Sequence, residues 1–170
     1  VLIIKATDKK NFGSNPGFDE IVDLNPRGLL ILFSDGNDYR RVQENRRCFE
    51  SEDVVPSPYI LVSVKKGNLY ISYSDKNNDV IYTFRHRNSE FELIGNDNGC
   101  DGCEGFSHDN KRSINFLTKK QLVKTCAKYK GYECIKFEET WSNITIKKPI
   151  RLRDFCSDDF YLDKYIDYKK

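Results

Sequence analysis

Apolar and polar residues alternate in short runs along most of this chain. The runs are rich in Ile, Val, Leu, Tyr, Phe and Thr, and clusters of Gly, Asn and Asp separate them. Because side chains alternate between the two faces of a strand, and because Gly, Asn and Asp suit tight turns, this pattern is typical of consecutive antiparallel strands. It predicts a mainly β protein, an antiparallel meander of hairpins that forms a sandwich or a curved sheet with at most one or two short helices.

Three hairpins are predicted between residues 28 and 95. The first pairs residues 28–33 with residues 39–44, and the others span residues 59–74 and 79–95. Each contains two adjacent residues that suit the backbone of a tight turn. These turn residues are Asp35 and Gly36, Lys66 and Gly67, and Asn88 and Ser89.

Further strands are predicted later in the chain by the same alternation. They cover residues 112–118, 132–141 and 143–148. Two longer loops remain, at residues 8–26 and 96–111. Because binding and catalytic residues concentrate on loops, we expect a local function to lie in one of these two.

One internal segment, residues 118–131, carries a helix signal. Thr118 can cap a helix and Gly131 can end it. The spacing of Leu122 and Cys126 suits a hairpin as well, so both interpretations stay open.

Length sets the expected domain organisation. A chain of 170 residues can bury a continuous core as one domain. We expect a single β-rich domain over residues 1–156, followed by an acidic, aromatic segment at residues 157–170. Ser157 can cap a helix, and apolar residues follow it at helical spacing, so residues 157–168 are expected to form a short helix or an ordered tail.

Charge narrows the classes of partner. Lys and Arg number 28 against 26 Asp and Glu, a formal net charge of +2. No long-range field of one sign is available to attract nucleic acid or anionic lipid, so neither is expected as a partner. No apolar run approaches the roughly 20 residues needed to cross a bilayer, so no membrane span is expected.

Two features favour export. The chain opens at Val1 with the apolar run VLIIKA and contains no Met, so we expect that an upstream signal or lipid anchor was removed. The even number of cysteines is compatible with three disulfides in an oxidising compartment, which predicts a periplasmic, cell-surface or extracellular location. The cysteines are Cys48, Cys100, Cys103, Cys126, Cys134 and Cys156.

The chain also resembles a known group of proteins. The segments YTFRHRNSEFELIGND (82–97), SINFLTKK (113–120) and ETWSNITI (139–146), and more loosely LNPRGLLILF (24–33), are similar to uncharacterised secreted or lipoprotein-like β-proteins of Gram-negative bacteria. Some members carry an upstream segment like the calcium-binding loops of FG-GAP repeats, which this chain does not contain. The resemblance implies an exported β-protein and transfers no catalytic residue.

The stretch NDNGCDGCEGFSHD, residues 96–109, holds the densest candidate chemistry. Cys100, Cys103 and His108 have the spacing of the first three ligands of a zinc knuckle, but Ser113 stands where the fourth ligand is expected. The simpler interpretation is a disulfide-tied loop. A redox role for the two cysteines is disfavoured because Asp101 and Glu104 oppose formation of a thiolate.

Oxygen ligands in the same stretch suggest weak calcium binding. Asn96, Asp97, Asn98 and Asp101 lie around glycines, but Ser107 stands where an EF-hand needs a closing Glu. The simpler interpretation is that Asn, Asp and Gly make good turns.

Enzymatic sites are poorly supported. Ser107, His108 and Asp109 are the residue types of a hydrolase triad, but contiguous side chains rarely converge. His86 is expected on a sheet face, and the neighbours Glu138 and Glu139 are expected to point to opposite faces.

Aromatic residues are the last candidate for a ligand-binding site. Trp141 and the many Tyr and Phe residues are interleaved with arginines, a combination able to form a face that stacks on sugars or nucleobases. These arginines are Arg85, Arg87, Arg151 and Arg153. Most aromatics are nevertheless expected in the core.

Together these features predict an exported, non-enzymatic domain that binds a protein or a glycan at the bacterial cell surface or in the periplasm. An inhibitor or immunity-type role belongs to this class, and no cofactor is expected. The alternative is a metal-binding domain that holds zinc or calcium in the 96–111 loop, with Cys100, Cys103 and His108 as the zinc ligands.

Overall fold

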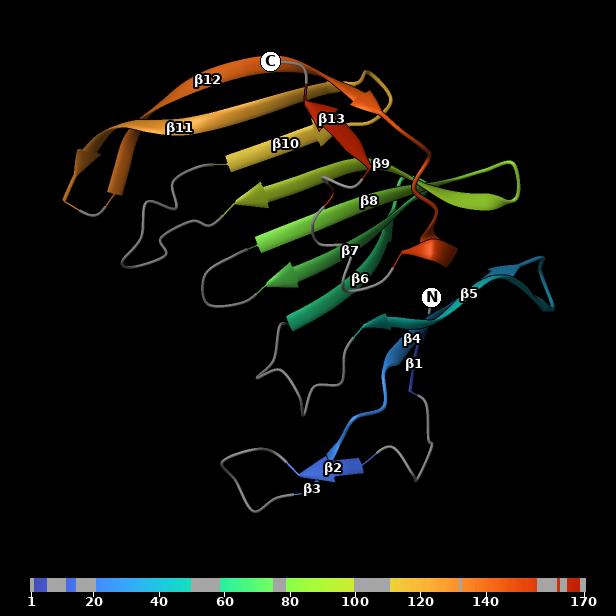
Figure 1. Ribbon diagram of the computed structural model, residues 1–170. Coiled ribbons are helices and arrows are strands. Elements are labelled where there is room, and N and C mark those ends of the chain that lie inside the picture. The colour runs from blue at the N-terminus through green and yellow to red at the C-terminus, as the bar shows by residue number, and fades with distance from the viewer. Residues whose placement is uncertain are drawn as a thin grey trace. The chain divides into compact units, whose positions relative to one another are not determined.

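The computed structural model confirms a mainly β protein (Figure 1). Antiparallel strands and a short 3₁₀ turn, η1 (Leu152–Asp154), make up its regular structure. Within the described part of the chain, no helix is long and apolar enough to cross a membrane. The structure describes residues 2–5, 12–14, 21–49, 59–74, 79–99, 111–131, 133–155, 162 and 165–168.

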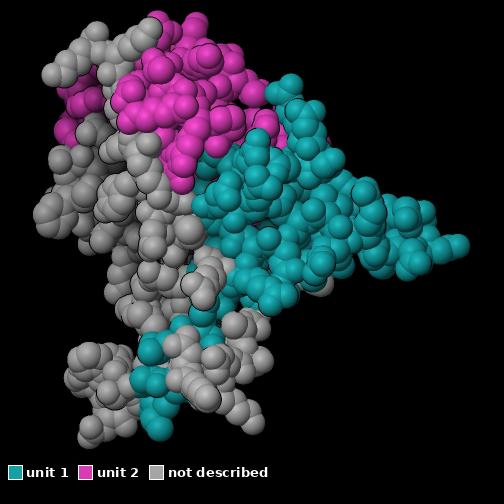
Figure 2. Space-filling view, turned by 45° about the vertical axis from the view of Figure 1, so that its right-hand side comes forward, with its two compact units in different colours: residues 1–58, 86–91, 150–161 teal, residues 59–85, 92–149, 162–170 magenta. Residues whose placement is uncertain are grey.

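Contacts between residues divide the chain into two compact units (Figure 2). Unit 1 comprises residues 1–58, 86–91 and 150–161. Unit 2 comprises residues 59–85, 92–149 and 162–170. The expected single domain over residues 1–156, with a separate segment after it, stays a prediction.

Unit 1 contains a three-stranded antiparallel sheet and a small ribbon. The sheet has the order β1 (Leu2–Lys5), β4 (Arg27–Ser34), β5 (Tyr39–Phe49). The predicted hairpin at residues 28–44 is confirmed, and Gly36 in its turn has a φ of +108°. The ribbon pairs β2 (Phe12–Ser14) with β3 (Ile21–Asp23), so the predicted loop 8–26 contains two short strands.

A buried amide organises the core of unit 1. The Asn45 side chain on β5 donates through Nδ2 to the carbonyl oxygen of Leu152, at 2.8 Å, and to that of Phe155. Leu152 and Phe155 are themselves almost fully buried. A buried donor needs such acceptors, so Asn45 fixes the segment around η1 against β5.

Gly28 explains why β4 and β5 approach so closely. A Cβ at this position would lie 2.5 Å from the Asn45 carbonyl oxygen and 2.7 Å from the Arg46 Cα. Both are backbone atoms, so only glycine fits here.

Unit 2 is built on an eight-stranded antiparallel sheet. Its order is β13-β12-β11-β10-β9-β8-β7-β6, so all eight strands follow one another in the sheet as they do in the sequence, as a meander predicts. The tip of the β8–β9 hairpin, residues 86–91, is counted with unit 1. The strands are β6 (Tyr59–Lys65), β7 (Asn68–Ser74), β8 (Asp79–Arg87), β9 (Glu90–Gly99), β10 (Lys111–Asn115), β11 (Lys120–Lys130), β12 (Glu133–Ile146) and β13 (Ile166–Tyr168).

The turns predicted for the second and third hairpins are confirmed. Lys66 and Gly67 have φ values of 51° and 75°, and Asn88 and Ser89 have values of 49° and 64°. Two consecutive residues with positive φ define the tight turn whose twist matches that of the flanking strands.

One face of the unit 2 sheet is covered and forms the core. Along β7 and β8, residues at every second position are buried, as alternation predicts. Within the described residues this core includes Leu69, Ile71, Tyr73, Val80, Tyr82, Phe84, Leu93, Ile94, Ile114, Phe116, Ile144 and Ile166.

Of the two interpretations left open for residues 118–131, the hairpin is correct and the helix is wrong. Residues 120–130 form β11, which pairs with β10 on one side and β12 on the other. Thr118 does not cap a helix; its backbone N–H and that of Leu117 donate to Asn115 Oδ1 in the preceding turn. Pairing on both edges outweighs a local capping signal.

Two further predictions are corrected. The strands predicted at 132–141 and 143–148 are one continuous strand, β12. At the C-terminal end, residues 166–168 form β13, whose Ile166 pairs with Ile146, so these three residues belong to a strand and not to the helix that was one of the two alternatives for residues 157–168. Residues 156–161, 163 and 164 lie outside the described residues.

Candidate functional site: the outer face of strands β9 to β12

The predicted zinc ligands Cys100, Cys103 and His108 lie outside the described residues, as do the triad candidates Ser107 and Asp109. Among the residues that are described, no three His, Cys, Asp or Glu side chains are close enough to hold a metal ion. The zinc site therefore stays a prediction.

The first part of the candidate calcium loop is a strand and not a loop. Asn96 and Asp97 are adjacent on β9, and their side chains have different surroundings. Asn96 is buried and donates through Nδ2 to the Ile81 carbonyl oxygen, at 3.4 Å. Asp97 is exposed and accepts a hydrogen bond from Ser113 Oγ. Neighbours on opposite faces of a strand cannot share one ion, and Asp101 lies outside the described residues.

The predicted aromatic and arginine face does not form as one group. Arg151 Nε and Arg153 Nη1 bind the two carboxylate oxygens of Glu90 in unit 1, at 2.8 and 2.7 Å. Arg85 in unit 2 donates to Asn68 Oδ1. Trp141 belongs to unit 2 and to none of these pairs.

His86 lies in an aromatic contact of unit 1. Its ring is 5.0 Å from the ring of Phe33 and 5.0 Å from that of Phe91, between centroids. Its Nε2 atom is buried and has no hydrogen-bond partner among the described residues. These neighbours suit a packed side chain better than an exposed base.

Trp141 occupies the open face of the unit 2 sheet. Its side chain is 61% exposed although it lies on a central part of the 14-residue strand β12. Residues directly opposite each other on neighbouring antiparallel strands project to the same face of the sheet. The cross-strand partners of Trp141 therefore show which side chains share its face. These partners form one row across four strands: Asp97 on β9, Ser113 on β10, Leu122 on β11 and Trp141 on β12.

Charged and polar side chains border this Trp141 row. Lys124 and Glu139 form the neighbouring pair on the same face, two residues from Leu122 on β11 and from Trp141 on β12. The Lys124 Nζ and Glu139 Oε1 atoms form an ion pair at 2.6 Å. Lys120 and Asn143 form the next cross-strand pair on the same face, on the other side of the Trp141 row, and both are exposed. The row is thus an exposed indole and a half-buried Leu122 between two polar margins.

Beyond the row, β11 and β12 continue as a two-stranded arm, residues 125–138. β10 pairs with β11 only as far as Lys124, and β13 pairs with β12 only from Ile144. Within the described chain no third strand pairs with the arm, and Figure 1 shows β11 and β12 extending past the end of β10. An isolated two-stranded ribbon is marginally stable by itself.

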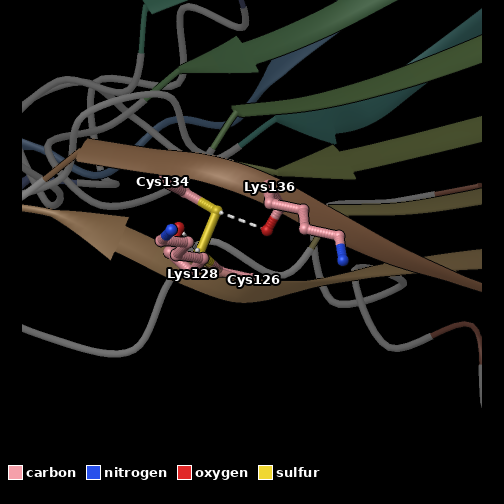
Figure 3. Close-up of a disulfide and its surroundings, with 4 residues drawn as sticks. All are labelled: Cys126, Lys128, Cys134 and Lys136. Carbon is pink, nitrogen blue, oxygen red and sulfur yellow. Dashed lines mark hydrogen bonds between the residues drawn. A yellow bond between two sulfur atoms is a disulfide. The ribbon is translucent and has the colours of Figure 1, made fainter.

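A disulfide closes the arm (Figure 3). Cys126 on β11 and Cys134 on β12 are joined with a Cα–Cα distance of 5.8 Å, and Gly131 near the tip has a φ of +63°. The Cys134 sulfur lies 3.3 Å from the Lys136 carbonyl oxygen. The ladder shifts register between Cys126 and Tyr129, so the disulfide stabilises the place where strand pairing is irregular.

No second disulfide is found among the described residues. Cys48 is fully buried in unit 1. Cys100, Cys103 and Cys156 lie outside the described residues. One disulfide is therefore established, and the prediction of three stays a prediction.

The arm exposes further apolar side chains. Tyr129 and Ile135 are 49% and 48% exposed, and Phe137 is half-buried with Lys111 Nζ 5.7 Å from its ring centroid. From Ile135 to Trp141 the strand covers about 20 Å at the usual rise per residue. Apolar side chains that are exposed or half-buried thus occur along β12 over this length, and Tyr129 adds another on β11.

Glu138 and Glu139 lie on opposite faces of β12, as the sequence predicted. Their partners are the consecutive residues Thr125 and Lys124. Glu139 is engaged with Lys124, so the two carboxylates do not form an acid and base pair.

Sequence reasoning identified Trp141 but placed it with the wrong neighbours. It missed Leu122, which lay in a segment left open between a helix and a hairpin, and the pairing of Asp97 with Ser113, because Asp97 was assigned to a loop and Ser113 to a strand. The spacing of Cys126, Gly131 and Cys134 was the available signal, since two cysteines about a glycine turn can close a hairpin.

Comparison with known proteins gives no family for this chain: no protein-family model, no curated protein and no solved structure matches it.

Proposed function

We propose that this protein is an exported, non-enzymatic binding domain and that its ligand docks on the Trp141 row and the adjoining arm. The observation that carries the proposal is the 61% exposure of Trp141 on a sheet whose other face provides the core. A large aromatic side chain on a rigid strand, bordered by charged residues, is the usual composition of a binding hot spot.

The rigidity of the surface supports this role. Leu122 lies on β11, which is paired with β10 on one side and β12 on the other, and Trp141 lies directly opposite Leu122 on β12. A binding surface that is already ordered loses little conformational entropy on association. The disulfide extends the same advantage to the arm.

A protein is the partner that these features favour. Tyr129 and Ile135 add exposed apolar side chains on the arm beyond the Trp141 row, over a distance that suits a protein interface. The arm also projects past its neighbouring strand, as binding loops of stapled inhibitors do. An inhibitor or immunity-type role falls within this proposal.

A glycan is the second candidate. The Trp141 row carries the Asp97 carboxylate and the Ser113 hydroxyl on the same face as the indole. An aromatic ring with hydrogen-bonding groups beside it is also suited to stack on a sugar.

The disulfide supports export. Cys126 and Cys134 are bonded in a partly exposed hairpin, and such bonds persist in the periplasm or outside the cell but are reduced in the cytosol. A periplasmic, cell-surface or extracellular location is part of the proposal.

The experiment is a matched capture from the protein's native compartment. Wild-type protein and the Trp141→Ala and Tyr39→Ala variants are immobilised, and the Kd of the ligand that the wild type retains is then measured by calorimetry. Tyr39 is the control because it is a 72% exposed aromatic residue in unit 1. We expect Trp141→Ala to weaken binding by at least about 30-fold, the ratio that corresponds to the loss of a hot spot, and Tyr39→Ala to bind like the wild type.

Two treatments of the extract identify the class of ligand. Protease digestion should abolish capture if the ligand is a protein, and periodate oxidation of vicinal diols should abolish it if the ligand is a glycan. Equal affinity of wild type and Trp141→Ala would refute the proposed site.

A further inference from the structure

The last strand of the unit 2 sheet, β6, has an open edge. β6 pairs with β7 over all seven of its residues, from Tyr59↔Ser74 to Lys65↔Asn68. Within the described residues no strand pairs with its other edge. An open edge exposes backbone donors and acceptors that can pair with another chain.

The turn after β6 determines which backbone groups face this edge. Lys65 and Asn68 flank the two-residue turn and form its closing pair, whose N–H and C=O groups point toward each other. Backbone groups alternate in direction along the strand, so those of Leu61 and Ser63 also point to β7. The groups of Ile60, Val62 and Val64 therefore point to the open edge.

The side chains of β6 do not protect the edge. Proteins usually block an open edge with proline, a bulge or a charge pointing inward. β6 contains no proline, its register with β7 is regular, and its single charged residue is Lys65 beside the turn. Leu61 and Val64 are instead 64% and 62% exposed.

We propose that β6 pairs antiparallel with β6 of a second copy of this chain, centred on Val62. Because the outward groups belong to every second residue, Val62 then opposes Val62 of the copy, and Ile60 opposes Val64. All seven residues take part in this register, with reciprocal hydrogen bonds at its three outward positions. The dimer is a continuous sheet formed from both copies.

The strand is complementary to itself in this register. On the core-facing side the opposing residues are Ile60, Val62 and Val64, all β-branched and apolar, a favourable cross-strand combination. On the outer side Leu61 opposes Ser63. Lys65 opposes position 59 of the copy, which is Tyr, so no two like charges are placed opposite each other. This self-complementarity favours a second copy over an unrelated strand.

The register makes position 62 a direct test. Val62→Lys places two lysines opposite each other across the symmetry axis, and Val62→Glu does the same with two carboxylates. A 1:1 mixture of these variants instead places Lys opposite Glu. Ser63→Lys is the control, because it adds the same charge to the same strand but opposite Leu61 of the copy.

Sedimentation equilibrium should find the wild type and Ser63→Lys dimeric, each 62 variant monomeric and the 1:1 mixture dimeric again. Val62→Pro, which removes an outward N–H and leaves the bonds of Leu61 and Ser63 to β7, should also be monomeric. Thermal unfolding checks that each variant is folded. A monomeric wild type, a dimeric Val62→Pro or a mixture that stays monomeric would overturn the proposal.

Discussion

Single residues show how the core and the ligand-binding surface differ in their chemistry. Tyr82 on β8 is fully buried, and its ring packs edge-on against that of Tyr73 with centroids 6.0 Å apart. Burial disfavours the phenolate, so it raises the pKa of Tyr82 far above its usual range. Trp141, by contrast, is held by the backbone of β12 and leaves most of its ring in solvent.

The buried hydroxyl of Tyr82 predicts a loss of stability in alkali. In the unfolded chain this tyrosine releases its proton near pH 10, whereas the folded protein retains it. The stabilisation is complete below that pH and is lost as the pH rises above it, because only the unfolded state gains by ionising. We expect the free energy of unfolding, measured in urea, to fall above about pH 10 and to fall less steeply in Tyr82→Phe. Parallel curves for the two proteins would contradict this explanation.

The exposure of Trp141 was partly predictable at the residue scale. Trp141 and Ile144 are three positions apart, so on a continuous strand they face opposite sides, and a core position for Ile144 leaves Trp141 outside. The sequence analysis divided this strand near Ser142, and the alternation could not then be carried from one residue to the other. Continuity of β12 depends on pairing with β11, which is not a local property.

At the scale of elements, hairpins with clear turn residues were predicted well. Lys66, Gly67, Asn88 and Ser89 adopt the positive φ values that the turn type requires. Residues 118–131 were ambiguous because Gly131, which can end a helix, equally suits the turn at the tip of the arm. Which of these forms depends on partners supplied by β10 and β12, and their registers are set by contacts distant in sequence.

The arm is the element whose ordered structure depends most on the Cys126–Cys134 disulfide. The disulfide closes a short loop, and by chain entropy this contributes at most about 3 kcal/mol. Because the arm lies outside the core, the effect should remain local. In the double variant Cys126→Ser, Cys134→Ser we expect faster amide hydrogen exchange in residues 125–138 and unchanged exchange in β7 and β8.

Hydrogen exchange resolved by mass spectrometry makes this measurement, with the wild type as reference. An equal rise of exchange in β7 and β8 would show that the disulfide supports the whole of unit 2. Unchanged exchange in the arm would show that strand pairing alone orders it.

At the scale of the molecule, unit 2 uses its sheet in two different ways. One face is covered by apolar side chains and provides stability, while the other presents the Trp141 row. At one end of the sheet β13 pairs with β12, and Asp167 on β13 forms an ion pair with Lys147, directly after β12, at 2.9 Å; at the other end, no strand of the described residues pairs with the outer edge of β6. These separate locations allow ligand binding and self-association to be tested independently.

Ligand binding at Trp141 can be observed directly at that residue. The chain contains a single tryptophan, so 5-fluorotryptophan gives one ¹⁹F NMR signal, which reports on position 141 without interference from a partner's own residues. We predict that this signal shifts or broadens as the captured ligand is added and that the change saturates at the stoichiometry found by calorimetry. A signal that stays unchanged when calorimetry shows the protein saturated with ligand would contradict the account.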